Sequence, residues 1–138
     1  MKLARIAMPL VALFSLTGCF NGTSVMNVGF SCATGVRTMD KNHFKFTCTK
    51  ASGQSIYTFY IKDTSWDKIQ VEVSVTNSEI TQETFGFALV DASNETLYAT
   101  AVTESTFATE LSHNGAGKYR IAIQCKNYSG SYTFTWGA

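Results

Sequence analysis

The sequence predicts an all-β protein: a single antiparallel β-sandwich of about eight strands, with jelly-roll or immunoglobulin-like topology. Apolar and polar residues alternate with a period of two through most of the chain. Clusters of Gly, Asn, Asp and Ser separate these runs. No segment shows a 3.6-residue period over about ten residues or more, so we expect no long helix.

The first strands are expected as a hairpin with its turn at residues 39–41. In residues 43–49, Phe44, Phe46 and Cys48 alternate with polar neighbours. A turn centred near residue 40 would bring apolar residues of the two strands onto one face. The facing pairs would be Cys32 with Cys48, Thr34 with Phe46, and Val36 with Phe44.

The clearest single strand is 68–76, where Ile69, Val71, Val73 and Val75 alternate with polar residues. This pattern predicts a strand with one buried and one wet face. The other expected strands are 55–62, 85–89, 96–102, 106–111, 119–125 and 132–136. Turn signals lie between them at 52–53, 63–67, 77–83, 91–95, 113–117 and 127–130.

The N-terminus has the pattern of an export signal. Residues 1–5 contain Lys2 and Arg5 and no acid, and residues 6–16 are almost wholly apolar. A stretch of this length is too short to span a bilayer, which takes about 20 residues. It ends in Leu16-Thr17-Gly18-Cys19, which resembles the lipobox of bacterial lipoproteins.

The lipobox resemblance implies that Cys19 carries lipid and that cleavage removes residues 1–18. Phe20 stands where Asp often marks retention in the inner membrane, so the outer membrane is favoured. The alternative is an ordinary signal peptide cut near Gly18, which would leave Cys19 able to join a disulfide. We expect residues 19–28 to form the lipidated N-terminus and a short tether, and 29–138 to form the domain.

Charge argues against nucleic acid as a partner. Removal of Lys2 and Arg5 with the signal leaves nine basic and ten acidic residues, a formal charge of −1. No basic field remains to attract nucleic acid or anionic lipid. A tether of roughly nine residues would hold the domain within about 30 Å of the membrane, so we expect a partner in the envelope.

Three cysteines remain once Cys19 is assigned to lipid, and export permits a disulfide. The hairpin pairing favours Cys32–Cys48, which in the chain-entropy model would stabilise by roughly 3 kcal/mol. The rival pairing is Cys48–Cys125, since both also lie on apolar strand faces. A third possibility is that all three are free thiols.

A second resemblance covers residues 55–136. The matching stretches are Tyr57-Thr58-Phe59, Ile69–Val73, Leu89-Val90-Asp91, Gly117–Ile123 and Tyr132–Thr135. This region is similar to the bacterial pre-peptidase C-terminal (PPC) domain, a small β-sandwich appended to secreted proteases. The resemblance implies a binding or secretion accessory. Some relatives bind calcium through an acidic N-terminal linker, but Asp40 is the only acid between Cys19 and Asp63, so calcium is not favoured.

The sequence offers no set of catalytic residues. It has two histidines, at 43 and 113, and no Gly-x-Ser-x-Gly motif. The cysteine spacings of 16 and 77 residues do not resemble a zinc or redox motif. We therefore expect no cofactor and no metal. Five carboxylates could be considered for sugar hydrolysis but are expected to be surface charges: Glu72, Glu79, Glu83, Asp91 and Glu104.

Two aromatic residues are candidate ligand contacts. Trp66 lies in a polar loop, where an indole can stack on a sugar or anchor a protein interface. The alternative is that Trp66 plugs the end of the sandwich. Tyr128 lies at the 127–130 turn, where its side chain is expected to be exposed. Trp136 shares a face with Tyr132 and Phe134 and is expected in the core.

These observations predict a lipid-anchored, non-enzymatic envelope protein that binds a protein or a glycan. A first alternative is an inhibitor lipoprotein directed at an attacking enzyme such as lysozyme. Phe46-Thr47-Cys48 and Ala51-Ser52-Gly53 resemble short stretches of the membrane-bound lysozyme inhibitors. A second alternative is an exclusion lipoprotein of the phage or plasmid type.

Overall fold

The computed structural model describes residues 24–40, 42–62 and 68–136. They form eight antiparallel strands, which confirms the predicted all-β class and strand number. The strands are β1 (Ser24–Ser31), β2 (Thr34–Asp40), β3 (His43–Ile61), β4 (Lys68–Val75), β5 (Phe85–Val90), β6 (Thr96–Ala101), β7 (Thr106–Ser112) and β8 (Gly117–Thr135). Within the described ranges no helix is present that could cross a membrane.

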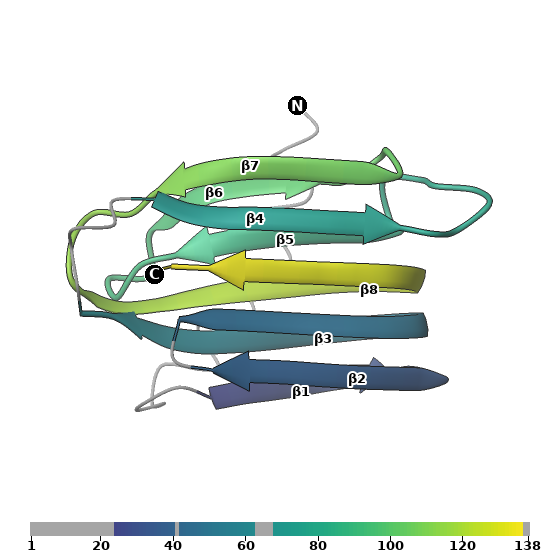
Figure 1. Cartoon of the computed structure of the whole chain (residues 1–138), viewed down its shortest axis with the longest axis horizontal. Coiled ribbons are helices and arrows are strands. Elements are labelled where there is room, and N and C mark those ends of the chain that lie inside the picture. Colours follow the sequence, from purple (N-terminus) through teal and green to yellow (C-terminus); the bar gives the residue numbers. More distant parts are fainter. Residues whose placement is uncertain (1–23, 41, 63–67, 137–138) are drawn as a thin grey trace.

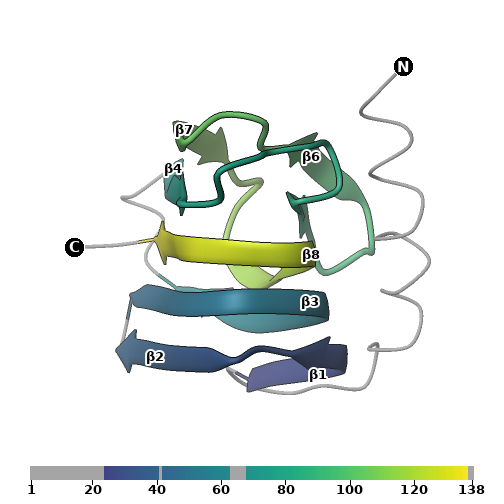
Figure 2. The same cartoon turned by 90° about the vertical axis from the view of Figure 1, so that its right-hand side faces the viewer.

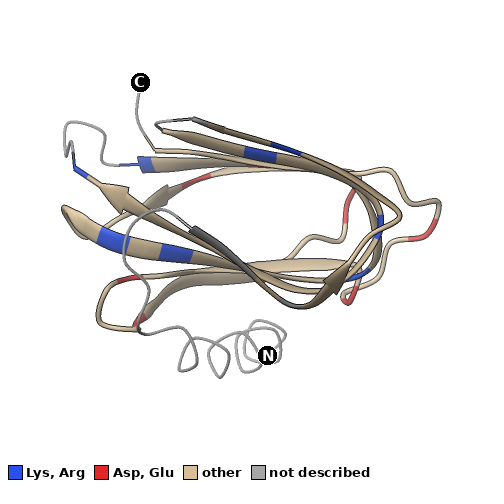
Figure 3. Cartoon of the chain, turned by 90° about the horizontal axis from the view of Figure 1, so that it is seen from below, with Lys and Arg blue, Asp and Glu red and all other residues tan. Residues whose placement is uncertain are grey.

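Two long strands, β3 and β8, run through both layers of the sandwich. Each has 19 residues, and they pair with each other along nearly their whole length. The first half of β3 and the second half of β8 lie with β2, β4 and β7 in what we call the front layer. The other halves lie with β1, β5 and β6 in the back layer. Figure 1 faces the front layer, Figure 2 shows β4 and β7 apart from β6, and Figure 3 shows both layers edge-on.

The passage between layers occurs at two bends. Lys50 and Asn127 have φ near +50°, and Gly53 and Gly130 have φ of 113° and 151°. The β3–β8 register shifts there, as it does at β-bulges, which bend strands and increase their twist. The turns expected at 52–53 and 127–130 are therefore bends within continuous strands, and the sequence-based division of β3 and β8 into separate strands was wrong.

At the bends, side chains form hydrogen bonds with backbone groups of the two strands. The Ser129 hydroxyl accepts from the Lys50 N–H at 3.0 Å, and the Ser52 hydroxyl accepts from the Asn127 N–H at 2.9 Å. The Asn77 side chain donates to the carbonyl of Asn127 at 2.6 Å and accepts from the N–H of Ser129 at 2.8 Å. These bonds explain why short polar residues occur at both bends.

Aromatic side chains from both layers fill the space between them. The rings of Phe44 and Tyr57 are stacked with centroids 4.3 Å apart. Trp136 packs against Phe59 at 4.4 Å and is 4% exposed, which confirms its predicted place in the core. Such rings bury large areas and add to the stability of the core.

The two layers differ on their outer faces. At the centre of the back layer the outward positions are also buried: Ile56, Thr58, Ala88 and Ala122 have 0% exposure. In the front layer the outward positions are polar and reach solvent, as the alternating burial of β4 shows. Accessible functional groups on a strand face are therefore found on the front layer.

The β2–β3 hairpin is present, but its predicted register was wrong by three residues. Asp40 pairs with His43, so the connection is centred between residues 41 and 42 and not at 40. The partners of Phe44, Phe46 and Cys48 are Met39, Arg37 and Gly35, in that order. A shift by an odd number exchanges the two faces of a strand. Val36, expected to face the core, is consequently 68% exposed.

The predicted boundary between tether and domain also needs correction. Residues 24–28, expected in the tether, form most of β1 and pair with residues 54–58 of β3. A side-chain hydrogen bond of 2.8 Å from Ser55 to Asn27 accompanies this pairing. This pairing covers the edge that the half of β3 in the back layer would otherwise expose. The domain therefore includes residues from Ser24 onward.

Candidate ligand-binding face

The outer side of the front layer carries the accessible polar groups of the fold. In β3, Phe44 and Phe46 point inward, and Lys45 between them points outward. In β8, Tyr132 and Phe134 are buried on either side of Thr133. The buried rings fix the backbone of each strand, so the outward side chains are held at regular spacing.

The register aligns these side chains in rows across the strands. One row runs from Thr38 through Lys45, Thr133 and Glu72 to Ala108. Lys45 and Glu72 lie on either side of Thr133, so the backbones that carry the cation and the carboxylate are two strand spacings apart, about 10 Å.

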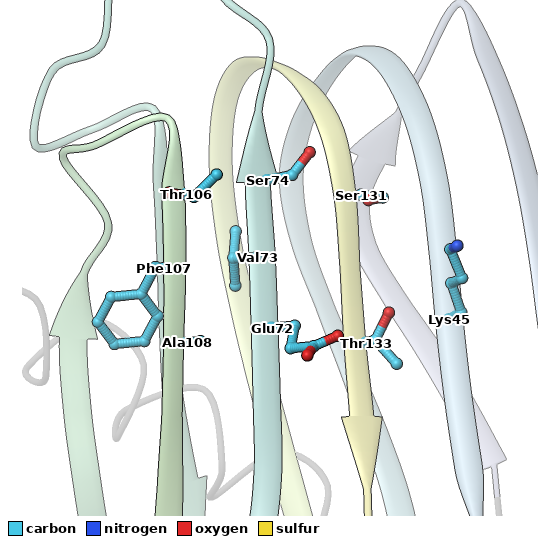
Figure 4. Close-up of a pocket in the computed structure, with 9 residues that line it drawn as sticks. All are labelled: Lys45, Glu72, Val73, Ser74, Thr106, Phe107, Ala108, Ser131 and Thr133. Atoms are coloured by element: carbon cyan, nitrogen blue, oxygen red, sulfur yellow. The ribbon is translucent and has the colours of Figure 1, made fainter.

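A second row runs beside the first. It contains Val36, Thr47, Ser131, Ser74 and Thr106. The second row therefore presents four hydroxyl groups beside the groups of the first row. Figure 4 shows Lys45, Thr133, Glu72, Ser131 and Ser74 on adjacent strands. We call these two rows the polar face.

A shallow hollow of about 360 Å³ lies on the polar face. Its lining combines one amine, one carboxylate and the hydroxyls of Ser74, Thr106, Ser131 and Thr133. Phe107 lies at its margin but packs against the core ring of Phe87, with centroids 6.0 Å apart. The hollow therefore offers hydrogen bonds over its surface and little aromatic area.

A second hollow of about 280 Å³ continues along β4 and β7 and shares Glu72 and Ala108 with the first. It adds Gln70 and Glu110, whose side chains are hydrogen bonded at 3.4 Å. Together the hollows form a polar strip that crosses several strands. Such a strip suits an extended ligand with many hydroxyl groups, because each hydroxyl can donate and accept.

Tyr128 is not part of any exposed site, and its predicted role as a ligand contact was wrong. It is fully buried, its ring lies 4.7 Å from that of Phe85, and its hydroxyl donates to the Ser74 carbonyl at 2.8 Å. Burial raises the pKa of Tyr128, and the nearby thiols of Cys48 and Cys125 add to this. The positive φ of Asn127 changes the direction of the chain just before Tyr128.

Other predicted site residues have different outcomes. Trp66 and Cys19 lie outside the described residues, so their roles stay predictions. Cys32, Cys48 and Cys125 are free thiols in this structure. In the described part of the chain, no group of three His, Cys, Asp or Glu side chains is placed to hold a metal ion.

Asp91 has a structural role that the sequence analysis missed. It was expected at the surface, but it is 7% exposed. Its carboxylate accepts from the backbone N–H groups of Ser93 and Glu95 at 2.9 and 3.0 Å, and from the Asn114 side chain at 2.8 Å. The Tyr119 hydroxyl donates to the Asn114 side chain at 2.7 Å. This network joins the 91–95 and 113–117 loops and fully engages the carboxylate.

The pKa of Asp91 reflects this network. Burial acts to raise it, but the hydrogen bonds from Asn114, Glu95 and Ser93 outweigh burial and lower it. The carboxylate is therefore stabilised in its charged form. A group held in this way fits a structural role better than proton transfer near neutral pH.

No family model matches the chain, and no curated protein does. Among solved structures it is similar to CBM51 from Clostridium perfringens GH95 in complex with methyl-galactose, with 9% identity, coverage of 86% of this chain and 94% of that chain, and a TM-score of 0.48. It is also similar to the PPC domain of a Bacillus anthracis collagenase, with 12% identity and a TM-score of 0.44. This match covers 84% of this chain and 90% of that chain.

A third similar structure is CBM29-2, a family 29 carbohydrate-binding module complexed with mannohexaose. The identity is 10%, the TM-score is 0.42, and the match covers 83% of this chain and 78% of that chain. At such identities, with TM-scores below 0.5, these likenesses assign neither a family nor a ligand to this chain.

Proposed function

We propose that this protein is a lipid-anchored, non-enzymatic envelope module that binds glycan on the polar face. The observation that carries the proposal is the aligned row of Lys45, Thr133 and Glu72, with hydroxyls of the neighbouring row beside it. Hydroxyl groups match the donors and acceptors of sugars. The amine and the carboxylate would pair with a glycan that carries both kinds of charge, and peptidoglycan with its peptide stems is such a polymer.

Anchoring limits where this glycan can be. With β1 beginning at Ser24, only residues 20–23 separate it from Cys19. Four residues reach about 14 Å when fully extended, so the domain would lie close to the membrane that holds the lipid. Cys19 as the lipid site, residues 1–18 as the signal and the outer membrane as the location are parts of this proposal. They rest on the lipobox resemblance.

Co-sedimentation with purified peptidoglycan sacculi tests the proposal. We expect residues 20–138, which contain all eight strands, to sediment with the sacculi. Thr133→Val keeps the shape of the side chain and removes a hydroxyl at the centre of the row, so affinity should fall about fivefold. Lys45→Ala should lower it about tenfold, because a charged hydrogen bond is lost.

Lys126→Ala is the matched control. Lys126 is also an exposed lysine, and neither Lys126 nor its ion-pair partner Glu83 lines either hollow. This variant should bind sacculi as the unaltered chain does. Equal binding by all four proteins would contradict the polar face as the site. Inhibition of lysozyme turnover without sacculus binding would favour the inhibitor alternative. Loss of sacculus binding in Trp66→Ala, with binding kept in the Lys45 and Thr133 variants, would place the binding site at the 63–67 loop.

A further inference from the structure

Three cysteine side chains lie in the core or pack against it. Cys48 in the first half of β3 is 2% exposed, and Cys125 in β8 is 5% exposed. Cys32 lies in the connection between β1 and β2, is half-buried and packs against the same core. All three are free in this structure, so their positions show which pair is placed to react.

Gly35 reveals the position of the Cys32 sulfur. In the β2–β3 pairing, Gly35 is the direct partner of Cys48. The side chains of direct partners point to the same face, with Cβ atoms about 5 Å apart. A Cβ atom added at Gly35 would lie 3.0 Å from Sγ of Cys32 and 2.8 Å from the ring of Phe46. The Cys32 sulfur therefore occupies the space of the absent side chain, directly across from Cys48.

Cys125 is the other thiol near Cys48, and Cys48–Cys125 is the rival pairing. The register partner of Cys125 is Gly53, whereas Cys48 pairs with Gly130, so these two cysteines lie on opposite sides of the bend of the β3–β8 ribbon. Cys32 is the most accessible of the three, which lets an external disulfide reach it first. Burial raises the pKa of Cys48 to about 12, with Cys32 nearby as a second cause. Burial also raises the pKa of Cys125, with Cys48 nearby as a second cause.

We propose that Cys32 and Cys48 form a disulfide when the chain folds in the presence of a disulfide oxidant such as glutathione disulfide. The Cys32 thiolate attacks the oxidant and releases one glutathione thiolate. The Cys48 thiolate then attacks the Cys32 sulfur of the mixed disulfide and releases the second. The two protons from the cysteines pass to the two glutathione thiolates, so two cysteines are oxidised and one glutathione disulfide is reduced.

The bond would fasten the N-terminal strands to the centre of the sandwich. In the described sheet, β1 and β2 each pair with β3 alone, so β1 is one edge strand of the back layer and β2 is one edge strand of the front layer. A bond from the β1–β2 connection to β3 holds both of these strands at once. If Cys19 carries the lipid as proposed above, the tether pulls on β1, the strand that leads into this connection.

Oxidative refolding tests the proposal and does not depend on glycan binding. Residues 20–138 are refolded from denaturant with reduced and oxidised glutathione, remaining thiols are blocked with N-ethylmaleimide, and linked peptides are identified by mass spectrometry. We expect one internal disulfide joining Cys32 and Cys48, a single blocked thiol at Cys125, and a melting temperature about 10 °C above that of the reduced protein.

Two variants distinguish the pairings. Cys125→Ser should still form the bond, while Cys32→Ser should fold, since its side chain is only half-buried, and should show two blocked thiols. Three blocked thiols in the unaltered chain, or an internal disulfide that persists in Cys32→Ser, would overturn the proposal. Circular dichroism of every variant confirms folding, and Cys32→Ala replaces Cys32→Ser if the hydroxyl is not tolerated.

Discussion

At the scale of single residues, Asp91 shows how a carboxylate can be structural in a loop. Its three hydrogen bonds connect the turn after β5 with the turn before β8. Because the pKa of Asp91 is lowered in the folded protein, its contribution to stability is present above the unfolded pKa of about 4. That contribution is lost as the pH falls through the lower, folded value.

We therefore expect the free energy of unfolding to decrease below about pH 4, in part through Asp91. In Asp91→Asn the amide oxygen can still accept from Ser93 and Glu95, so the variant should fold. Below about pH 4, the slope of the free energy of unfolding against pH should be shallower for this variant than for the unaltered chain. Chemical denaturation at several pH values between about 2 and 7 measures this. An unchanged slope would show that Asp91 is not linked to stability.

Residue-level predictions from the sequence succeeded where alternation alone decides burial. Trp136 falls on the apolar face of its strand and lies in the core, as expected. Tyr128 and Asp91 were assigned to the surface because they stand beside turn-forming residues. Their burial depends on Ser74 and Asn114, which are distant in sequence, and no local pattern reveals such partners.

At the scale of elements, the bends in β3 and β8 decide how one ribbon serves two layers. Gly130 is the tightest point. A Cβ atom there would lie 1.9 Å from the carbonyl oxygen of Ser74, and its φ is 151°. Gly117 has a similar φ of 144° but no atom within 4 Å of an added Cβ. A comparison of substitutions at the two glycines therefore separates the cost of backbone strain from the cost of a steric clash.

Gly130→Ala should therefore destabilise the protein by more than about 3 kcal/mol, because a backbone atom must move in addition to the strain. Gly117→Ala should cost about 1–3 kcal/mol, from the backbone conformation alone. Urea denaturation of both variants measures the difference. Equal losses would show that the close approach to Ser74 does not constrain the bend.

The sequence located these bends but could not distinguish them from hairpin turns. Ser-Gly and Asn-Tyr-Ser-Gly signal a change of direction, and whether the chain then reverses or continues in another layer depends on its neighbours. The hairpin register failed for a similar reason. A connection centred between residues 41 and 42 and one centred on residue 40 both fit the local composition, but they place opposite faces of β2 inward.

At the scale of the whole molecule, the two layers differ in how much of their outer face reaches solvent. The back layer is buried on both faces at its centre, while the front layer keeps its outer face in contact with solvent. The sequence predicted that such a polar face exists, from the alternation in 43–49 and 68–76. It could not predict that Lys45, Thr133 and Glu72 align, because the order of β3, β8 and β4 in the sheet was not known.

The most direct test of the central claim is an NMR titration of residues 20–138 with soluble peptidoglycan fragments. We expect the backbone resonances of Lys45, Thr133, Ser131 and Glu72 to shift together and saturably. Resonances of Gln54 and Gln124, which lie on the outer side of the back layer, should not move. Shifts confined to the 91–95 and 113–117 loops, or no shifts at saturating fragment concentrations, would contradict glycan binding on the polar face.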